Sequence, residues 1–505
     1  MFKEASMEEL GISDIRSQLQ SGELTVRQLV DSYVGRIETH DQRGPKVNSI
    51  IELNPQAHEL ANELDAELRA GKIRGPLHGV PILLKDNIDT ADRMQTTAGS
   101  LALVGHHASR DAGLVEKLRA AGALILGKTN LSEWANFRGK NSVSGWSSRG
   151  GLTRNPYALD RSACGSSSGA GAATAANFCA AAVGTETDGS IICPAQTNGV
   201  VGIKPTLGLV SRSGIIPIAH SQDTAGPMAR TVADAAILLG ALAGPDKRDT
   251  ATRSSAKKGL TDYSPFLDPN GLKGARIGVA RSLFGSDKRF LDIMESSLDA
   301  MKQAGAILID VELKSSDAFG KSELEVLLFE FKADLNAYLS TCTDVAVRSM
   351  LDVIQFNEEH RGRVMPYFGQ ERMEQAQERG PLTSKKYLSA LEKNRRLARA
   401  EGLDAVMRKR RLACIVVPSG GAAWVIDLVN GDGGRNWDMD STSYAAVAGY
   451  PHITVPAGYV FGLPVGISFI GRAWQEPTLI KLAYAFEQAT RVRRPPQFLP
   501  TARLG

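Results

Sequence analysis

The spacing of apolar residues predicts helices at the start of the chain. Residues 7–40 and 55–71 place apolar side chains at the three- and four-residue intervals of an amphipathic helix. In SGELTVRQLVDSYVGRIE, Thr25 stands just before the apolar run, where a helix N-cap is expected. We therefore expect residues 1–75 to form an N-terminal helical segment.

Further along, short apolar runs alternate with helical segments, which predicts a sheet with helical crossovers over residues 78–240. The runs are VPILL (80–84), ALILG (123–127), AAAVG (180–184) and GVVGI (199–203). Residues 280–410 are predicted to be helical and charged. Strands return over 412–490, in IVVPSG and HITVPAGYVFGLPVGISFIG. Strands on both sides of a helical block predict one sheet built from distant segments, with 280–410 as a cap or insert in a single domain, 1–505.

Composition and charge exclude several classes of protein. The 505 residues are 43% hydrophobic and 23% charged, which is typical of a globular protein with a sizeable core. A net charge of +4 is small for this length, so neither a nucleic-acid partner nor a membrane surface is expected.

The cysteines predict reduced thiols. Five cysteines are scattered along the chain with no CxxC pair, so neither a disulfide framework nor a zinc site is expected. Cys193 is interpreted as a small packing residue. The N-terminus has no apolar signal region, so we expect a cytoplasmic protein unless a secretory signal has been trimmed.

Three segments carry candidate chemistry. LHGVPILLKDNID ends an apolar strand at Lys85, which is either a surface lysine with a buried stem or a buried base with a lowered pKa. ACGSSSGAGAATAANFCAAAVG sets three serines before a helix of small residues. GTETDGSIICPA places Ser190 after a turn, where it could cap a helix or lie beside backbone N–H groups that converge near Gly189.

GSSSG also matches G-x-S-x-G, the nucleophile elbow of α/β-hydrolases, with Ser167 at its centre. That elbow follows a buried strand and needs an acid and a histidine downstream. The preceding RNPYALDRSAC is polar and predicts no strand, and only His220, His360 and His452 follow. The sequence therefore disfavours this alternative.

Four segments resemble the amidase signature family in their order and spacing: GVPILLKDN, CGSSSGAGAA, GTETDGSIICPA and GVVGIKPTLGLVSRSGIIPIAHSQDTAGPMARTVADAA. Three later segments resemble the peptide amidase subgroup of this family: LLFEFKADLNAYL, FNEEHRGRVMPYFGQE and AVAGYPHITVPAGYVFGLPVGISFIGR. The resemblance covers nearly the whole chain. It implies an α/β fold with a single large, twisted, mixed β-sheet covered on both faces by α-helices.

The resemblance also implies a catalytic triad of Lys85, Ser166 and Ser190, with a cis peptide bond before Ser166. Ser190 is the implied nucleophile, and Ser166 passes its proton to a neutral Lys85. The backbone N–H groups of Thr187, Asp188 and Gly189, with that of Ser190, form the implied oxyanion hole. No metal or other cofactor is implied.

Departures from the family pattern narrow the expected substrate to a small-molecule or peptide amide with a neutral or apolar acyl group. Many members carry arginine where this chain has Ile192, and an arginine there could pair with a substrate carboxylate. A C-terminal peptide amide fits this change. The alternatives are an amidotransferase subunit of a larger complex and a non-catalytic binding protein on an amidase scaffold. The sequence leaves the oligomeric state open.

Two further groups of residues are candidates for the substrate cleft. Met365, Tyr367 and Phe368 either line an apolar cleft or pack in the core. Trp424, Trp437 and Asp438 lie in a glycine-rich stretch that could close over the site.

Overall fold

A large mixed sheet forms the centre of the computed structural model, which describes residues 9–313, 316–433 and 441–504. Within these residues eleven strands are joined in the order β1-β3-β2-β8-β10-β9-β14-β15-β13-β11-β12. Their bounds are β1 Ile50–Leu53, β2 Pro81–Lys85, β3 Leu124–Thr129, β8 Ala181–Glu186, β9 Val201–Lys204, β10 Thr224–Ala229, β11 Arg276–Val279, β12 Ile307–Asp310, β13 Cys414–Pro418, β14 His452–Val460 and β15 Leu463–Ile470. Two short ribbons lie apart from it: β4 Trp146–Ser147 with β5 Gly151–Leu152, and β6 Arg154–Asn155 with β7 Ala158–Ser162.

The sheet confirms the predicted mixed α/β fold. β2 runs parallel to β3 and β8, and β11 runs parallel to β12 and β13, whereas the remaining neighbours are antiparallel. The four apolar runs predicted as strands became β2, β3, β8 and β9. One strand, β12, falls inside the block predicted to be helical, because its four residues at the sheet edge are partly exposed and give only a short apolar signal.

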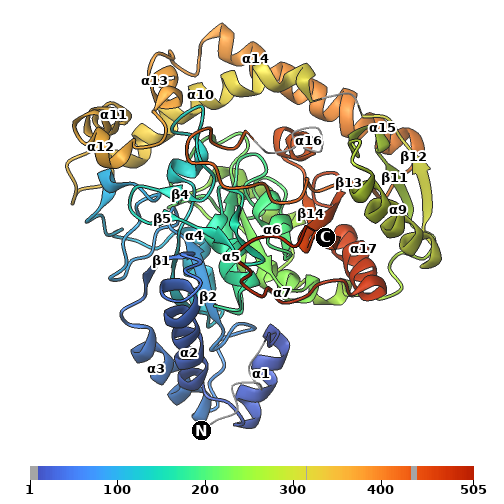
Figure 1. Ribbon diagram of the computed structural model, residues 1–505, viewed down its shortest axis with the longest axis horizontal. Helices are drawn as coiled ribbons and strands as arrows, with labels where there is room; N and C mark the ends of the chain where they lie inside the picture. Colours follow the sequence, from blue (N-terminus) through green and yellow to red (C-terminus); the bar gives the residue numbers. More distant parts are fainter. Residues whose placement is uncertain (1–8, 314–315, 434–440, 505) are drawn as a thin grey trace.

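Helices flank the sheet along its length (Figure 1). Their bounds are α1 Ile12–Ser21, α2 Val26–Arg36, α3 Ala57–Arg69, α4 Gly113–Ala120, α5 Ser168–Ala175, α6 Ile192–Thr197, α7 Val232–Leu242, α8 Ser255–Lys258, α9 Lys288–Gln303, α10 Asp317–Leu339, α11 Met350–Glu359, α12 Arg361–Val364, α13 Glu371–Gln377, α14 Lys385–Arg395, α15 Asp404–Arg410, α16 Thr442–Ala448 and α17 Glu476–Thr490. The predicted cap is present, because the Thr25 side chain accepts a hydrogen bond from the Gln28 N–H at the start of α2.

The helix α5 explains the run of small residues in the serine-rich segment. Every residue of α5 is buried, and the helix contacts β2, β3, β8 and β10. A Cβ added at Gly169 would lie 2.3 Å from the Ser49 carbonyl oxygen, so a larger residue would push the helix outward. Small side chains therefore let the serines at the start of α5 lie deep against the sheet.

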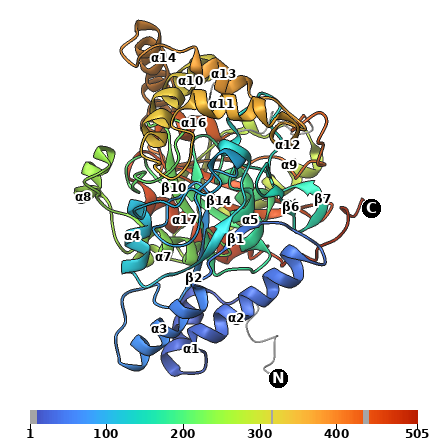
Figure 2. The same cartoon turned by 90° about the vertical axis from the view of Figure 1, so that its left-hand side faces the viewer.

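The helical block beyond the sheet lies away from the N-terminus. Helices α10 to α14 follow the top edge of Figure 1, and α1 to α3 lie at the bottom; Figure 2 shows the same separation. α10 packs against α11, α13 and α14. None of the helices in the described ranges is both long and apolar enough to cross a membrane.

Candidate active site

Strand β2 ends at a fully buried lysine. The Nζ of Lys85 lies 2.7 Å from Ser166 Oγ and 2.8 Å from Thr185 Oγ1. Burial lowers the pKa of Lys85 to about 7, although the negative charges of Asp223 and Glu186 raise it in part. The surface alternative for this lysine is therefore wrong, and a large fraction of the amine is neutral near pH 7.

Ser166 lies directly before α5 and follows a cis peptide bond from Gly165, as the resemblance implies. Its carbonyl oxygen accepts a hydrogen bond of 3.1 Å from the Ser132 N–H. A Cβ at Gly165 would lie 2.1 Å from Ser132 Oγ, so only glycine fits here. The Ser166 hydroxyl is thereby held within hydrogen-bonding distance of Lys85.

Ser190 lies in the turn that joins β8 to α6 and is 8% exposed. Its carbonyl oxygen accepts a hydrogen bond of 3.2 Å from the Ser167 N–H, so the two serine segments lie side by side. Gly189 has a φ of 76°, a conformation that favours glycine. Among the described residues, the N–H groups of Gly189 and Ser190 have no hydrogen-bond acceptor, and both are available to a substrate oxygen.

Side chains anchor this turn to two different segments. Thr187 Oγ1 donates a hydrogen bond of 2.5 Å to Asp223. The carboxylate of Asp188 accepts hydrogen bonds of 2.6 Å from the hydroxyls of Thr442 and Ser443 at the start of α16. The turn is thus fixed from both sides, which limits the movement of its backbone N–H groups.

The central serine of GSSSG has a structural role. Ser167 Oγ donates to the Thr185 carbonyl oxygen at 3.0 Å and accepts from the Thr185 N–H at 3.2 Å. The expectation that no strand precedes this segment is wrong, because β7 ends at Ser162. β7 pairs only with β6, in a ribbon outside the main sheet, so it does not supply the buried strand of a nucleophile elbow.

A family model described as Amidase matches residues 28–480. The chain belongs to the amidase family. A probable amidase of Arabidopsis thaliana is 40% identical to it, and the match covers 98% of this chain and 92% of that protein. The crystal structure of the peptide amidase PAM, in complex with the competitive inhibitor chymostatin, superposes with a TM-score of 0.95 at 50% identity and covers 97% of this chain and 100% of that one.

A more distant relative is a glutamyl-tRNA(Gln) amidotransferase subunit of Halorhodospira halophila. It is 33% identical, and the match covers 96% of this chain and 98% of that protein. Together these relationships make the protein an amidase, a hydrolase of carboxamide C–N bonds, that resembles the peptide amidases.

The amidase contains a disulfide that the sequence analysis did not predict. Cys164 and Cys193 are bonded, with their Cα atoms 6.0 Å apart. The expectations of reduced thiols and of Cys193 as a simple packing residue are therefore wrong for this pair. The two cysteines are 29 positions apart in the sequence, with α5 and β8 between them, and only the folded arrangement of these elements brings the two sulfurs together.

Three aromatic side chains of the amidase form a group near the serine segment. The ring of Trp146 packs edge-to-face with those of Tyr367 and Phe368, and Tyr367 is 42% exposed. The next residue back from Trp146, Gly145, donates its N–H to Ser132, whose own N–H binds Ser166. Tyr367 is therefore exposed enough to contact a ligand, whereas Met365 and Phe368 are buried.

A buried ion pair supports this aromatic group. Arg138 forms a 2.6 Å salt bridge with Glu133, and neither side chain is exposed. The guanidinium also donates to the carbonyl oxygens of Val364 and Phe368, and its centre lies 4.1 Å from the centre of the Phe368 ring. Sequence analysis missed Glu133, Arg138 and Trp146, since no motif marks them and their contacts join segments more than 200 residues apart.

Trp424 covers the disulfide. Its side chain clusters with Cys164 and Cys193, and its Nε1 donates a hydrogen bond of 3.2 Å to Asp432. Asp432 in turn accepts a 2.6 Å hydrogen bond from the hydroxyl of Ser144. Trp424 therefore lies where the sequence analysis expected it, whereas Trp437 and Asp438 are outside the described residues.

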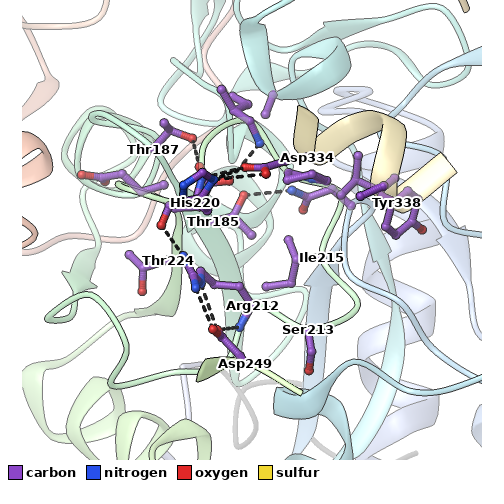
Figure 3. A pocket seen from close by; sticks show the side chains of 18 of the residues that line it. Thr185, Thr187, Arg212, Ser213, Ile215, His220, Thr224, Asp249, Asp334 and Tyr338 are labelled. Atoms are coloured by element: carbon purple, nitrogen blue, oxygen red, sulfur yellow. Dashed lines mark hydrogen bonds and ion pairs between the residues drawn. The ribbon is translucent and has the colours of Figure 1, made fainter. Parts of the chain in front are cut away.

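A cavity of about 370 Å³ meets the site on the side of the lysine. Asn87 and Thr185 line it, and Asn87 Nδ2 donates to Thr185 Oγ1 at 3.0 Å. Figure 3 shows two charged pairs in its lining, Arg212 with Asp249 and His220 with Asp334. Apolar and polar residues share the rest of the lining. The apolar ones are Ala135, Ile215, Ile216, Pro217, Ile218 and Ala337, and the others are Glu186, Thr187, Ser213, Asp223, Thr224, Arg248 and Tyr338.

Proposed function

We propose that this amidase is a serine hydrolase in which Ser190, Ser166 and Lys85 cleave the C-terminal carboxamide of peptides and release ammonia. One observation carries the proposal: a fully buried lysine with a pKa of about 7 lies 2.7 Å from a serine hydroxyl. That serine segment is bonded to the segment of a second serine in a glycine-containing turn. A buried amine of lowered pKa is suited to accept a proton at neutral pH.

The hydrogen bonds of Lys85 orient its lone pair. A neutral amine has two N–H bonds, and Thr185 offers it two acceptors, the hydroxyl at 2.8 Å and the carbonyl oxygen at 3.3 Å. When both are used, the lone pair is directed toward Ser166. Ser166 then donates its proton to Lys85 and can accept one from Ser190.

Acyl transfer follows from this arrangement. Ser190 Oγ attacks the substrate carbonyl carbon as its proton passes to Ser166 and the Ser166 proton passes to Lys85. The backbone N–H groups of Thr187, Asp188, Gly189 and Ser190 bind the oxygen that becomes negative. The reverse proton path delivers a proton to the leaving nitrogen, and the C–N bond breaks to give an acyl-enzyme. Water, deprotonated by the same pair, then releases the acid.

The lining of the site supports an apolar peptide substrate. Ile192 leaves no cation at the position where many family members carry arginine, so a dicarboxylic monoamide would lack a partner. The Trp146, Tyr367 and Phe368 group offers an aromatic surface to an apolar side chain. The related peptide amidase PAM binds chymostatin as a competitive inhibitor, which favours a peptide-like ligand here.

The second candidate is an amidotransferase component, which the 33% identity to the glutamyl-tRNA(Gln) amidotransferase relative supports. Such a component would hydrolyse glutamine in the presence of its partner chains. A non-catalytic binding protein is a third possibility, for which no labelling of Ser190 by a fluorophosphonate is expected. The independence from metals and cofactors, the absence of nucleic-acid and membrane partners, and the oligomeric state all stay predictions or open questions.

The deciding experiment measures ammonia release by wild type and Ser190→Ala on peptide amides, glutamine and simple aryl and alkyl amides. We expect peptide amides to be cleaved by wild type, with a loss of at least about 10⁴-fold in the variant, because the residual activity lacks the nucleophile. Equal activity of the two proteins would reject the role of Ser190. Release from glutamine alone, dependent on a partner, would favour the amidotransferase.

The cellular location also stays a proposal. The expected cytoplasmic location rested on an N-terminus without an apolar signal region and came with an expectation of reduced thiols, which the Cys164–Cys193 disulfide contradicts. Since structural disulfides are rare in reducing compartments, the bridge favours an oxidising one. Fractionation of the producing cells distinguishes a cytoplasmic location from an oxidising compartment.

A further inference from the structure

We propose that the Cys164–Cys193 disulfide is a positioning clamp for the two serines, and that its reduction reversibly switches the amidase off. The inference rests on the proposed function, because it assigns the bridge to the Ser166–Ser190 proton relay. Cys164 and Cys193 take no part in the bond changes of the reaction; they act by positioning the two serines.

The bridge joins the two serine segments directly. Cys164 stands two residues before Ser166, and Cys193 stands three residues after Ser190. The disulfide therefore closes a covalent loop from Cys164 to Cys193 that contains both serines, and it ties the two ends of that loop next to them. Few other bonds join these two segments close to the Ser166 and Ser190 hydroxyls. The hydrogen bond from the Ser167 N–H to the Ser190 carbonyl oxygen is 3.2 Å long, a weak tie for a relay that depends on sub-ångström placement.

Other contacts keep the surrounding elements in place without the bridge. Asn198 Nδ2 donates to the Ala163 carbonyl oxygen at 2.9 Å, and Thr197 Oγ1 donates to the same oxygen at 3.2 Å. Ser168 Oγ donates to the Cys164 carbonyl oxygen at 2.5 Å. Loss of the disulfide should therefore leave α5 and α6 docked and affect mainly the alignment of Ser166 with Ser190.

Access to the bridge is controlled by Trp424. The two cysteines are only 1% and 5% exposed, and Trp424 packs against both. Asp432 holds the Trp424 indole and also bonds the backbone N–H and hydroxyl of Ser144, next to the aromatic group. A reductant must displace Trp424 to reach the sulfurs. Reduction of the bridge therefore depends on movement of the segment that carries Trp424 and Asp432, which contacts Ser144 next to the aromatic group.

The reduction is a thiol–disulfide exchange with a dithiol. One thiolate of the dithiol attacks a cysteine sulfur, which forms a mixed disulfide and releases the other cysteine as a thiolate. The second thiolate of the dithiol then attacks the dithiol sulfur of the mixed disulfide, which closes the cyclic disulfide and releases the remaining cysteine as a thiolate. The dithiol loses two electrons and two protons and becomes a cyclic disulfide. Cys164 and Cys193 each gain one hydrogen and become thiols.

The test compares oxidised, dithiothreitol-reduced and reoxidised wild type with the Cys164→Ala/Cys193→Ala variant. Cys179→Ala/Cys414→Ala is the control, because it removes two buried thiols outside the bridge. Thiol titration of the denatured chain should count three thiols before reduction and five after it. We expect reduction and the double variant to lower kcat roughly 10- to 100-fold, with KM changed less than about twofold, as is typical of misplaced reacting groups.

Labelling of Ser190 by a fluorophosphonate should slow by a similar factor, and reoxidation should restore both rates. Trp424→Ala should speed the reduction about tenfold or more, since a buried sulfur exchanges only after exposure. The labelling rate tests the clamp even if no amide proves to be a substrate, so its failure and that of the proposed function are distinguishable.

Three outcomes would overturn the proposal. One is a protein with five titratable thiols and unchanged kcat. Another is a change confined to KM, which would assign the bridge to the cleft rather than to the relay. The third is loss of the circular dichroism spectrum on reduction, which would make the bridge a general structural staple. If the double variant fails to fold, reduced and reoxidised wild type decides the question.

Discussion

At the scale of single residues, the chemistry that we propose for this amidase depends on a lysine that carries no charge when it acts. Burial stabilises the neutral amine of Lys85, and the hydroxyl and carbonyl of Thr185 direct its lone pair toward Ser166. Asp223 and Glu186 counteract the burial through their negative charges. The balance of these opposed influences sets the pKa of Lys85 and, in the proposed mechanism, the pH at which the enzyme becomes active.

A pH profile tests this balance. We expect kcat/KM for a peptide amide to rise with pH through a midpoint near 7, because only the neutral form of Lys85 can accept the proton from Ser166. Initial rates at low substrate concentration between pH 5 and 9 measure it. Asp223→Asn should move the midpoint to lower pH, since the Asp223 carboxylate raises the pKa of Lys85. A flat profile over this range would contradict the role of Lys85 as the base.

The same lysine lowers the stability of the fold. Its pKa is about 7 in the folded chain and 10.5 in the unfolded one, so the unfolded chain binds more protons between these values and the free energy of unfolding rises with pH there. The burial penalty is therefore fully present below pH 7 and is relieved toward pH 10.

Lys85→Met removes this penalty together with the base. We expect activity to fall by at least about 10⁴-fold. The gain in unfolding free energy over wild type should be larger at pH 6 than at pH 9 by roughly 2–3 kcal/mol, given 1.36 kcal/mol per pKa unit. Urea unfolding of both proteins at the two pH values measures this difference. A gain that is independent of pH would show that folding does not lower the pKa of Lys85 and that the lysine stays charged in the folded protein from pH 6 to 9.

At the scale of elements, the site joins the end of β2, the start of α5 and the turn between β8 and α6. Each of these carries its candidate residue in one continuous motif, so the sequence could nominate Lys85, Ser166 and Ser190, and the structure brings their segments together. Their catalytic roles stay a prediction. The contacts that support these residues come from distant segments and left no local signal. Arg138 with Phe368 is an example. Cys164 and Cys193 lie within the two serine motifs, but nothing in those motifs shows that the two cysteines pair. For Asp188, the motif predicts its place in the turn but gives no sign of its hydrogen bonds to Thr442 and Ser443 of α16.

The aromatic group predicts a substrate preference that belongs to this scale. Tyr367→Ala should raise KM for peptide amides with a C-terminal phenylalaninamide about fivefold, the equivalent of ~1 kcal/mol of lost apolar contact, and leave kcat nearly unchanged. KM for alaninamide substrates should stay the same. Steady-state kinetics on the two series measure the effect. Phe461→Ala is a matched control, because it removes an exposed aromatic ring from the turn between β14 and β15. Equal effects on both substrate series would contradict the assignment.

At the scale of the whole molecule, the apolar runs of the sequence predicted the middle of the sheet better than its edges. β2, β3, β8 and β9 are continuous runs because both of their faces are buried. β12 is partly exposed and only four residues long, and it lies between two helical segments, so periodicity could not separate it from them. The single domain over 1–505 stays a prediction, because the shared sheet is consistent with it but its cooperativity has not been measured.

The strand order also has a consequence for how the chain is made. β9 ends at Lys204, yet one of its two neighbours in the sheet, β14, begins at His452. During synthesis, β9 is therefore an unpaired edge until about 250 further residues have left the ribosome. Such an edge can pair with other chains, and contacts this distant in sequence form slowly. We expect the nascent amidase to depend on chaperones, and the bonds from Asp188 to Thr442 and Ser443, which hold the turn of Ser190, to be among the last contacts of the site to form.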